Sequence, residues 1–251
     1  MTAHDGAISP PLCHTLATLL AELQMTSAKS VGRIIGMLFL VQVLLAPPVY
    51  TEFGMMRSIT ASDFLANAAS NAMQIKLALL LTLVLSALTL AAALVALPVF
   101  RQHSERMAHL FVALSVVGLA TQAVEAHAIR DMLSMSVAYT SGNAPKELLE
   151  ALGPMARSTW HSAHFTNLML GHLKAFVFFV IVYRLALVPR ALGAVGMAAT
   201  LLSTMAATVP LLGYRFSYLL IPPTALTQLA LTLWLITRGF EERQPLHSEA
   251  V

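Results

Sequence analysis

Long apolar runs alternate with short polar links along this chain. A helix needs about 20 predominantly apolar residues to cross a hydrocarbon core of about 30 Å, and six of the runs are near that length. The pattern therefore predicts an all-α membrane protein, a six-span transmembrane helix bundle. The expected spans cover residues 33–50, 73–100, 109–129, 157–184, 191–214 and 216–237.

Polar segments flank the predicted bundle on both sides. Residues 1–30 form a polar lead-in whose leucines recur at helical spacing, which is typical of an interfacial helix, although a disordered segment fits equally well. Residues 31–240 hold the six-span transmembrane domain. Residues 241–251 form a polar tail, which we expect on the cytoplasmic side.

The longest predicted connection covers residues 131–154. Within it, Asn143 followed by Pro145 resembles a helix start. Gly153 and Pro154 are expected to break any helix that forms there.

The first predicted span carries a glycine spacing that favours helix contact. Gly32 and Gly36 are four residues apart, so another helix can approach this surface closely. Pro47 and Pro48 are expected to end or kink the helix at its far side.

Composition agrees with a membrane protein. Hydrophobic residues make up 57% of the chain and charged residues 11%, with a mean hydropathy of +0.74. Soluble domains are typically about 45–50% apolar and about 25% charged. The lipid bilayer is thus the expected partner. No basic patch interleaved with aromatic residues suggests nucleic acid. The single cysteine excludes an internal disulfide.

The distribution of basic residues predicts the orientation in the membrane. An even number of spans places both termini on one side, and that side carries eight of the cations at or near the span ends, against five on the other. The eight are Lys29, Arg33, Arg101, Arg106, Arg184, Arg190, Arg238 and Arg243. Since basic residues favour cytoplasmic loops, both termini are expected in the cytoplasm.

Four segments resemble an uncharacterised bacterial multi-pass membrane family, domain of unknown function 4386. They are GRIIGMLFLVQVL, ATQAVEA, VPRALGAVGMAATLL and IPPTALTQLALTLWLITRG. The resemblance covers about residues 30–240 and implies a multi-pass protein of the bacterial cytoplasmic (inner) membrane. It implies no activity, because the family has none assigned. Gln228 stands where similar proteins usually carry an acid.

The predicted fourth span carries an unusual polar stripe. On an α-helix, Arg157, His161, His164 and His172 fall within an arc of about 80°, whereas Lys174 points to the opposite side. Ionisable groups are costly in hydrocarbon, so this stripe is expected to face a bundle interior or a water-filled cavity.

The third and fourth spans are expected to be antiparallel neighbours. This arrangement places Glu125 and His127 at about the depth of His161 and His164, with Gln122 on the face of Glu125. The first interpretation is a structural polar cluster, in which Glu125 pairs with an arginine. The candidate partners are Arg157 and Arg130.

A metal or haem site is a second interpretation. His161 and His164 have a spacing that can share one ion, and Glu125 or His127 would complete the shell. A haem between His127 and a histidine of the fourth span also suits a bundle. No diagnostic motif selects either cofactor.

A small-molecule transporter or binder is a third interpretation, because polar groups near the bilayer midplane mark substrate or proton paths. Its candidate residues are Gln42, Gln122, Arg157, His172 and Lys174. A fourth interpretation is a membrane enzyme of another type, for example one that acts on lipids, with a catalytic triad. That triad would be drawn from Ser158, Ser162, His161 and Glu125. The sequence is compatible with a homo-oligomer and does not specify one.

Overall fold

The computed structural model describes residues 27–50, 54–102, 104–215, 220 and 222–241. Its long helices are α2 (Ala28–Tyr50), α5 (Ala72–Arg101), α6 (Glu105–Ser141), α7 (Lys146–Arg184), α8 (Arg190–Thr208) and α9 (Pro222–Arg238). Its short helices are α3 (Arg57–Thr60), α4 (Phe64–Asn67) and the 3₁₀ turns η1 (Ala69–Asn71) and η2 (Val209–Leu212). The described chain is all-helical, as predicted.

Five helical segments are long and apolar enough to cross a membrane. They are Ala28–Tyr50, Ala69–Arg101, Glu105–Ser141, Lys146–Arg184 and Arg190–Leu212. The sixth predicted span corresponds to α9, which has 17 residues and is shorter than the roughly 20 residues that a full crossing needs. The described chain thus has five candidate spans, and α9 is a sixth long helix of lesser length.

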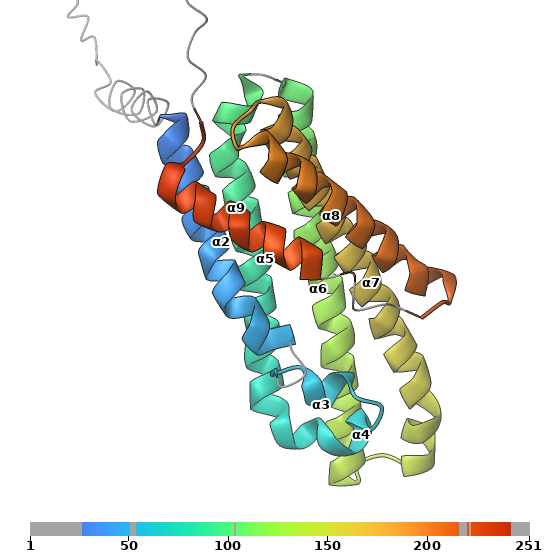
Figure 1. Ribbon diagram of the computed structural model, residues 1–251. Coiled ribbons are helices and arrows are strands. Elements are labelled where there is room, and N and C mark those ends of the chain that lie inside the picture. The colour runs from blue at the N-terminus through green and yellow to red at the C-terminus, as the bar shows by residue number, and fades with distance from the viewer. Residues whose placement is uncertain (1–26, 51–53, 103, 216–219, 221, 242–251) are drawn as a thin grey trace, which may run out of the picture.

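The long helices pack in chain order, and α9 closes the arrangement by lying against α2 and α8 (Figure 1). The contact between α2 and α9 uses the predicted glycine pair. A Cβ atom at Gly36 would lie 2.8 Å from the backbone nitrogen of Ile236, and one at Gly32 would overlap the backbone of Phe240. The predicted close helix approach is confirmed at Gly36, whose partner is α9, and Gly32 meets the two residues that directly follow α9.

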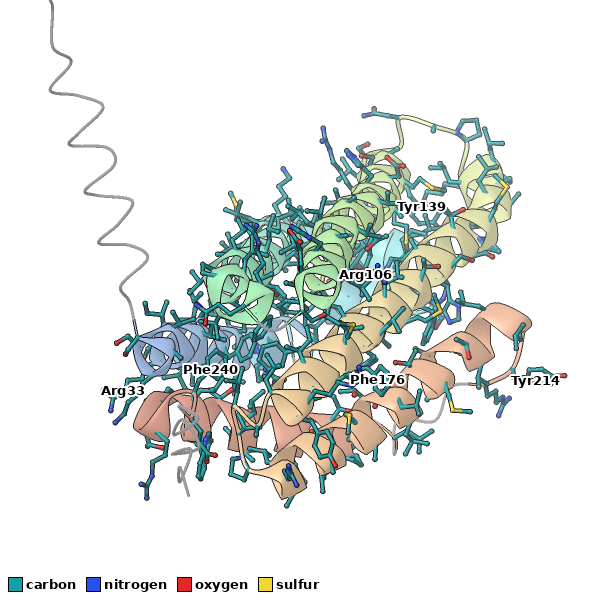
Figure 2. The ribbon with its side chains drawn as sticks, turned by 90° about the horizontal axis from the view of Figure 1, so that it is seen from above. Arg33, Arg106, Tyr139, Phe176, Tyr214 and Phe240 are labelled. Atoms are coloured by element: carbon teal, nitrogen blue, oxygen red, sulfur yellow. The ribbon has the colours of Figure 1, made fainter. Side chains whose placement is uncertain are left out.

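Two apolar cores stabilise opposite ends of the bundle. The first is built around phenylalanines whose rings meet at tilted angles, with ring centroids 5.4 Å apart for Phe111 and Phe178 and 6.1 Å for Phe100 and Phe240. Figure 2 shows Phe240 beside Arg33 at this end, with Tyr139 far from both. The second core packs the ends of α2, α5, α6 and α7 against α3 and α4. Its buried members include Val49, Ile59, Phe64, Ile75, Met132 and Trp160.

The prediction of a long connection over residues 131–154 is wrong. Helix α6 continues to Ser141 and α7 begins at Lys146, so residues 142–145 alone connect them. The buried face of α6 extends through Met132 and Ser136, and the Ser136 hydroxyl donates to the carbonyl oxygen of Leu65 at 2.9 Å. These contacts with α4 explain why the helix does not stop at the end of its apolar run.

The two helix-boundary predictions in this connection have different outcomes. The helix start at Pro145 is confirmed, since α7 begins at the next residue. The predicted break is wrong, because Gly153 and Pro154 lie inside α7. Gly153 instead allows α4 to approach, since a Cβ atom there would lie 3.2 Å from Leu65.

The predicted terminal segments fall almost wholly outside the described residues. Helix α2 begins at Ala28, within the lead-in expected over residues 1–30, and residues 1–26 are not described. Of the predicted tail, the structure describes Glu241.

Candidate functional site

One face of α7 points into the bundle along most of the helix. Its residues recur at alternating spacings of four and three, which keeps them on one side of an α-helix. They are Trp160, His164, Asn167, Gly171, Lys174 and Phe178. The facing side of α6 has the same spacing and runs antiparallel. Its residues are Phe111, Ser115, Gly118, Gln122 and Glu125.

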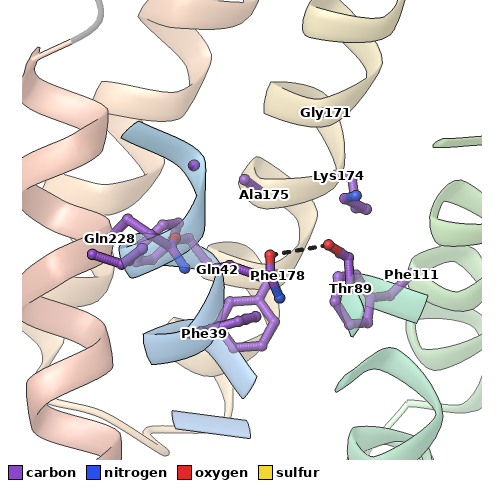
Figure 3. A pocket seen from close by; sticks show the side chains of 12 residues that line it. Phe39, Gln42, Thr89, Phe111, Gly171, Lys174, Ala175, Phe178 and Gln228 are labelled. Carbon is purple, nitrogen blue, oxygen red and sulfur yellow. Dashed lines mark hydrogen bonds between the residues drawn. The ribbon is translucent and has the colours of Figure 1, made fainter. Parts of the chain in front are cut away.

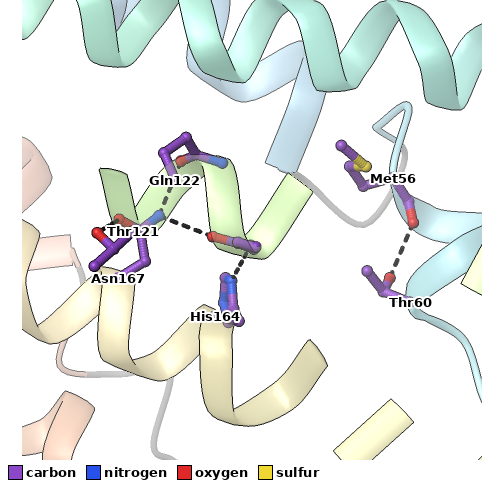
Figure 4. Close-up of polar contacts among 7 residues, drawn as sticks. Met56, Thr60, Thr121, Gln122, His164 and Asn167 are labelled. Atoms are coloured by element: carbon purple, nitrogen blue, oxygen red, sulfur yellow. Dashed lines mark hydrogen bonds and ion pairs between the residues drawn. The ribbon is translucent and has the colours of Figure 1, made fainter. Parts of the chain in front are cut away.

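A polar cluster joins these two faces near the middle of α6 (Figure 4). Nδ1 of His164 forms a hydrogen bond of 2.8 Å with Oε1 of Glu125. The side-chain nitrogen of Asn167 donates to Oε2 of Glu125 at 2.8 Å and to Oε1 of Gln122 at 2.9 Å. The Thr121 hydroxyl donates to Oδ1 of Asn167 at 3.0 Å. Each carboxylate oxygen of Glu125 therefore has a partner from α7.

The acid of the cluster is buried, and packing holds its histidine partner in place. Glu125 is 3% exposed, and a carboxylate removed from water needs hydrogen bonds or a counter-charge. The ring of His164 stacks on that of Trp160, with centroids 5.5 Å apart and an interplanar angle of 27°. The imidazole is thereby held in the orientation that reaches the acid.

The predicted pairing of Glu125 with an arginine is wrong. The partners of the acid are His164 and Asn167, and Arg130 is exposed on another face of α6. Arg157 is half-buried, and its Nη1 atom has no hydrogen-bond partner among the described residues.

The four residues predicted to bind a metal do not come together. Glu125 and His164 are in contact, whereas His161 and His127 are exposed. His127 follows Glu125 by two residues, so the two side chains diverge by about 200° around the helix. Within the described part of the chain, no group of three or more His, Cys, Asp or Glu side chains could hold a metal ion. The exposed position of His127 also does not favour a haem axial ligand inside the bundle.

A cavity of about 290 Å³ lies farther along the same face of α7 (Figure 3). It is lined by residues of α2, α5, α6, α7 and α9. Its polar lining residues are Gln42, Thr89, Lys174 and Gln228. Its aromatic lining residues are Phe39, Phe111, Phe178 and Phe179. The cavity thus has a polar set of side chains against an aromatic wall, which is typical of small-molecule sites.

Two donors in this cavity have no partner in the described structure. The Thr89 hydroxyl donates to Oε1 of Gln42 at 3.1 Å, which orients the amide, but Nε2 of Gln42 is buried without an acceptor. Lys174 has no ion-pair partner among the described residues. Its Nζ atom lies beside α6, 3.4 Å from where a Cβ atom of Gly118 would be. An unsatisfied buried donor such as Nε2 of Gln42 is costly, and the half-buried Lys174 adds a positive charge, so the cavity is suited to a ligand that supplies acceptors.

Comparison with known proteins supports the resemblance noted from the sequence. Residues 34–239 match the family model described as domain of unknown function (DUF4386). The chain belongs to this family. No curated protein and no solved structure matches the DUF4386 chain, so its site must be interpreted from its own residues.

The structure divides the polar stripe predicted for this DUF4386 chain. His164 contacts α6, His161 is exposed, and His172 is half-buried and does not line the cavity. Lys174, which was expected to point away from the polar interior, lines the cavity instead. The inward face of α7 is therefore centred on Asn167 and Lys174.

Of the five predicted ligand-binding residues, the structure brings two together in the cavity. These are Gln42 and Lys174, whereas Gln122 belongs to the polar cluster. Asn167 and Thr89 were not predicted as site residues from the sequence. A signal for Asn167 was present, since it lies three residues after His164 and seven before Lys174, on one helical face.

Proposed function

We propose that this DUF4386 protein binds a small molecule inside its helix bundle, as a membrane binder or transporter, and that the cavity holding Gln42 and Lys174 is the binding site. The observation that carries the proposal is that one cavity holds two donors without partners among the described residues. They are the buried amide nitrogen of Gln42 and the ammonium of Lys174, which has no ion pair. Ionisable groups within membrane bundles are commonly functional, because their burial has no structural advantage by itself.

The lining indicates the kind of ligand. Nε2 of Gln42 and Nζ of Lys174 are donors, so the ligand needs acceptor atoms at its polar end. Phe39, Phe111 and Phe178 offer an apolar surface to the rest of the molecule. The volume of about 290 Å³ is near the lower limit of ligand pockets, which favours a compact molecule with one apolar part.

The cluster around Glu125 has a structural role in this proposal. Asn167 precedes Lys174 by seven residues, so the cluster and the ammonium are about 10 Å apart along α7. Four side chains from α6 and α7 satisfy one another there, with Thr121 as a fifth. This arrangement fixes the register of the two helices and hence the position of Lys174 against Gly118.

We further propose a six-span topology in a bacterial inner membrane, with both termini in the cytoplasm. The end of α9 lies beside the start of α2, where Gly239 meets the backbone of Lys29. The backbone nitrogen of Glu241 also donates to the carbonyl oxygen of Leu187 in the α7–α8 link, at 2.9 Å. These contacts support an even number of crossings.

The short length of α9 is consistent with this topology. At its start, the Thr224 hydroxyl lies 2.6 Å from that of Ser203, which in turn donates to the carbonyl oxygen of Leu220 at 3.0 Å. Ser203 is 13 residues beyond the start of α8, or about 20 Å along its axis. Helix α9 thus begins inside the bundle, where α8 supplies hydrogen bonds to its first turn.

A ligand screen by thermal shift tests the proposed site. A compound present at a free concentration of 100 times its dissociation constant stabilises the folded state by about 2.7 kcal/mol. Any stabilising compound is then tested on Gln42→Leu and Lys174→Met, which should reduce the shift. His172→Leu is the matched control, because His172 lies two residues from Lys174 but outside the cavity. Equal loss in the control, or no loss in either cavity variant, would contradict the proposal.

A further inference from the structure

A second concave site lies on the outer surface of the bundle, between the first turns of α5 and the last third of α6. This groove has a volume of about 590 Å³ and is separate from the cavity. Its polar lining residues are Lys76, Arg130 and Ser134. Its larger apolar lining residues are Leu79, Leu133 and Val137.

Both cations of the groove are exposed and lack a counter-ion in the described structure. The ion pairs found among the described residues involve Arg101 with Glu105 and His164 with Glu125. Neither includes Lys76 or Arg130. Asp131 is adjacent to Arg130 in the chain, but it does not line the groove. Two positive charges from different helices therefore face one concavity without an acid.

The positions of the two cations in the sequence predict that they lie at about the same depth in the bilayer. Lys76 directly precedes the uncharged run 77–100 of α5, and Arg130 follows the predicted span 109–129 of α6. Because α5 and α6 are antiparallel, both positions mark one boundary of the hydrocarbon core. Lipid phosphates lie at this boundary, and Leu77 and Leu80 beside it are 47% and 58% exposed, as expected for contact with acyl chains.

We infer that this groove binds an anionic glycerophospholipid, whose phosphate is held between Lys76 and Arg130. On the proposed topology the lipid lies in the outer leaflet. Long basic side chains at span ends commonly reach the interface independently of one another. This site differs, because its two cations share one concavity and their charge complements that of a lipid phosphate. The apolar wall formed by Leu79 and Val137 would contact the glycerol and the first part of an acyl chain.

Native mass spectrometry of the full chain can test this inference. Purified protein is exchanged into mixed micelles that contain either phosphatidylglycerol or the zwitterionic phosphatidylethanolamine, and bound lipid is counted. We expect preferential retention of phosphatidylglycerol. A basic residue near an anionic lipid contributes about 1 kcal/mol, so Lys76→Gln or Arg130→Gln should weaken binding about fivefold, and both together about 25-fold. Equal retention of the two lipids would overturn the inference.

Two further variants separate a built groove from general surface charge. Arg184→Gln with Arg190→Gln removes two exposed cations at the opposite end of the bundle and should leave phosphatidylglycerol retention unchanged. Ser134→Trp fills the groove without changing its charge; Ser134 is exposed, so the fold should tolerate it. It should weaken retention at least as much as one charge removal. An equal loss in the arginine control, or full retention in folded Ser134→Trp protein, would overturn the inference.

Discussion

The side-chain nitrogen of Asn167 on α7 donates a hydrogen bond of 2.8 Å to Oε2 of Glu125 on α6. The same nitrogen donates to Gln122, and the other carboxylate oxygen bonds with His164. Asn167 therefore connects the neutral Gln122 to the ionisable pair of Glu125 and His164. Its loss would leave acceptors on α6 unsatisfied in the bundle interior.

Replacing Asn167 with Leu should destabilise the protein more than its modest volume change suggests. Interhelical hydrogen bonds in membrane proteins are worth about 0.6 kcal/mol on average, and a buried acceptor left unpaired costs about 1–3 kcal/mol. We expect a loss of about 1–2 kcal/mol in the free energy of unfolding, measured by denaturation in mild detergent. Ser162→Leu, on the exposed side of α7, should change it by less than about 0.5 kcal/mol. Similar losses in both variants would contradict a specific role for Asn167.

Glu125 and His164 should behave as one unit. Glu125→Ala and His164→Ala each remove one partner of the 2.8 Å contact, so the double variant should be less destabilised than the sum of the single variants. A coupling free energy of about 0.5–2 kcal/mol is expected for such neighbours. A double-mutant cycle on the free energy of unfolding measures it. Additive effects would show that the contact contributes nothing beyond packing.

Replacement by alanine should have opposite effects on stability at two glycines, of which only Gly36 lies at the close contact between α2 and α9. A Cβ atom at Gly36 would lie 2.8 Å from the backbone nitrogen of Ile236, whereas one at Gly171 would meet nothing within 4 Å. Gly36→Ala should therefore destabilise the protein by about 1–3 kcal/mol. Gly171→Ala should be neutral or stabilising by up to about 1 kcal/mol, because alanine is the better helix former. Melting temperatures of the two variants, compared in the same detergent, check the difference in sign.

Five of the six predicted spans fall on helices long and apolar enough to cross a membrane, because hydrocarbon imposes length and apolarity on them. Helix α5 covers Ala72–Arg101, against a predicted span of 73–100. The glycine spacing at Gly32 and Gly36 also predicted a close contact, although not its partner. The extent of α6 beyond residue 130 was not predictable from apolarity, since it depends on packing against α3 and α4, which lie outside the long apolar runs.

The candidate site was only partly predictable, for a related reason. Because ionisable groups are costly in hydrocarbon, the predicted stripe consisted of such groups and followed the histidines of α7. In the structure, the bundle interior instead holds side chains that find hydrogen-bond partners there. The neutral Asn167 is such a side chain, whereas His161 is exposed. The position of Lys174 depends on Gly118 of another helix, which no pattern within α7 reveals.

Gln42 is expected to lower the stability of the ligand-free protein, as residues of binding sites commonly do. Its Nε2 atom is buried without an acceptor among the residues that the structure describes, and Thr89 keeps a second acceptor in the carbonyl oxygen of Leu85. Gln42→Leu should therefore be neutral or raise the free energy of unfolding by about 1 kcal/mol in the absence of ligand. Thr89→Val should lower it by about 1 kcal/mol, because Oε1 of Gln42 then loses its donor. Clear destabilisation by Gln42→Leu would indicate a structural role for the amide.

The position of the C-terminal end relative to the membrane tests whether α9 completes a sixth crossing. Single cysteines at Glu241, Gln102 and Asn143, introduced after Cys13→Ser, are labelled with a membrane-impermeant thiol reagent in right-side-out and inside-out vesicles. The contact of Glu241 with the α7–α8 link places it at the same end as Gln102, whereas Asn143 lies in the opposite α6–α7 turn. We expect Glu241→Cys and Gln102→Cys to react only in inside-out vesicles, and Asn143→Cys only in right-side-out vesicles. Reaction of Glu241→Cys together with Asn143→Cys would mean five crossings, and reversal of all three would contradict the cytoplasmic assignment of the termini.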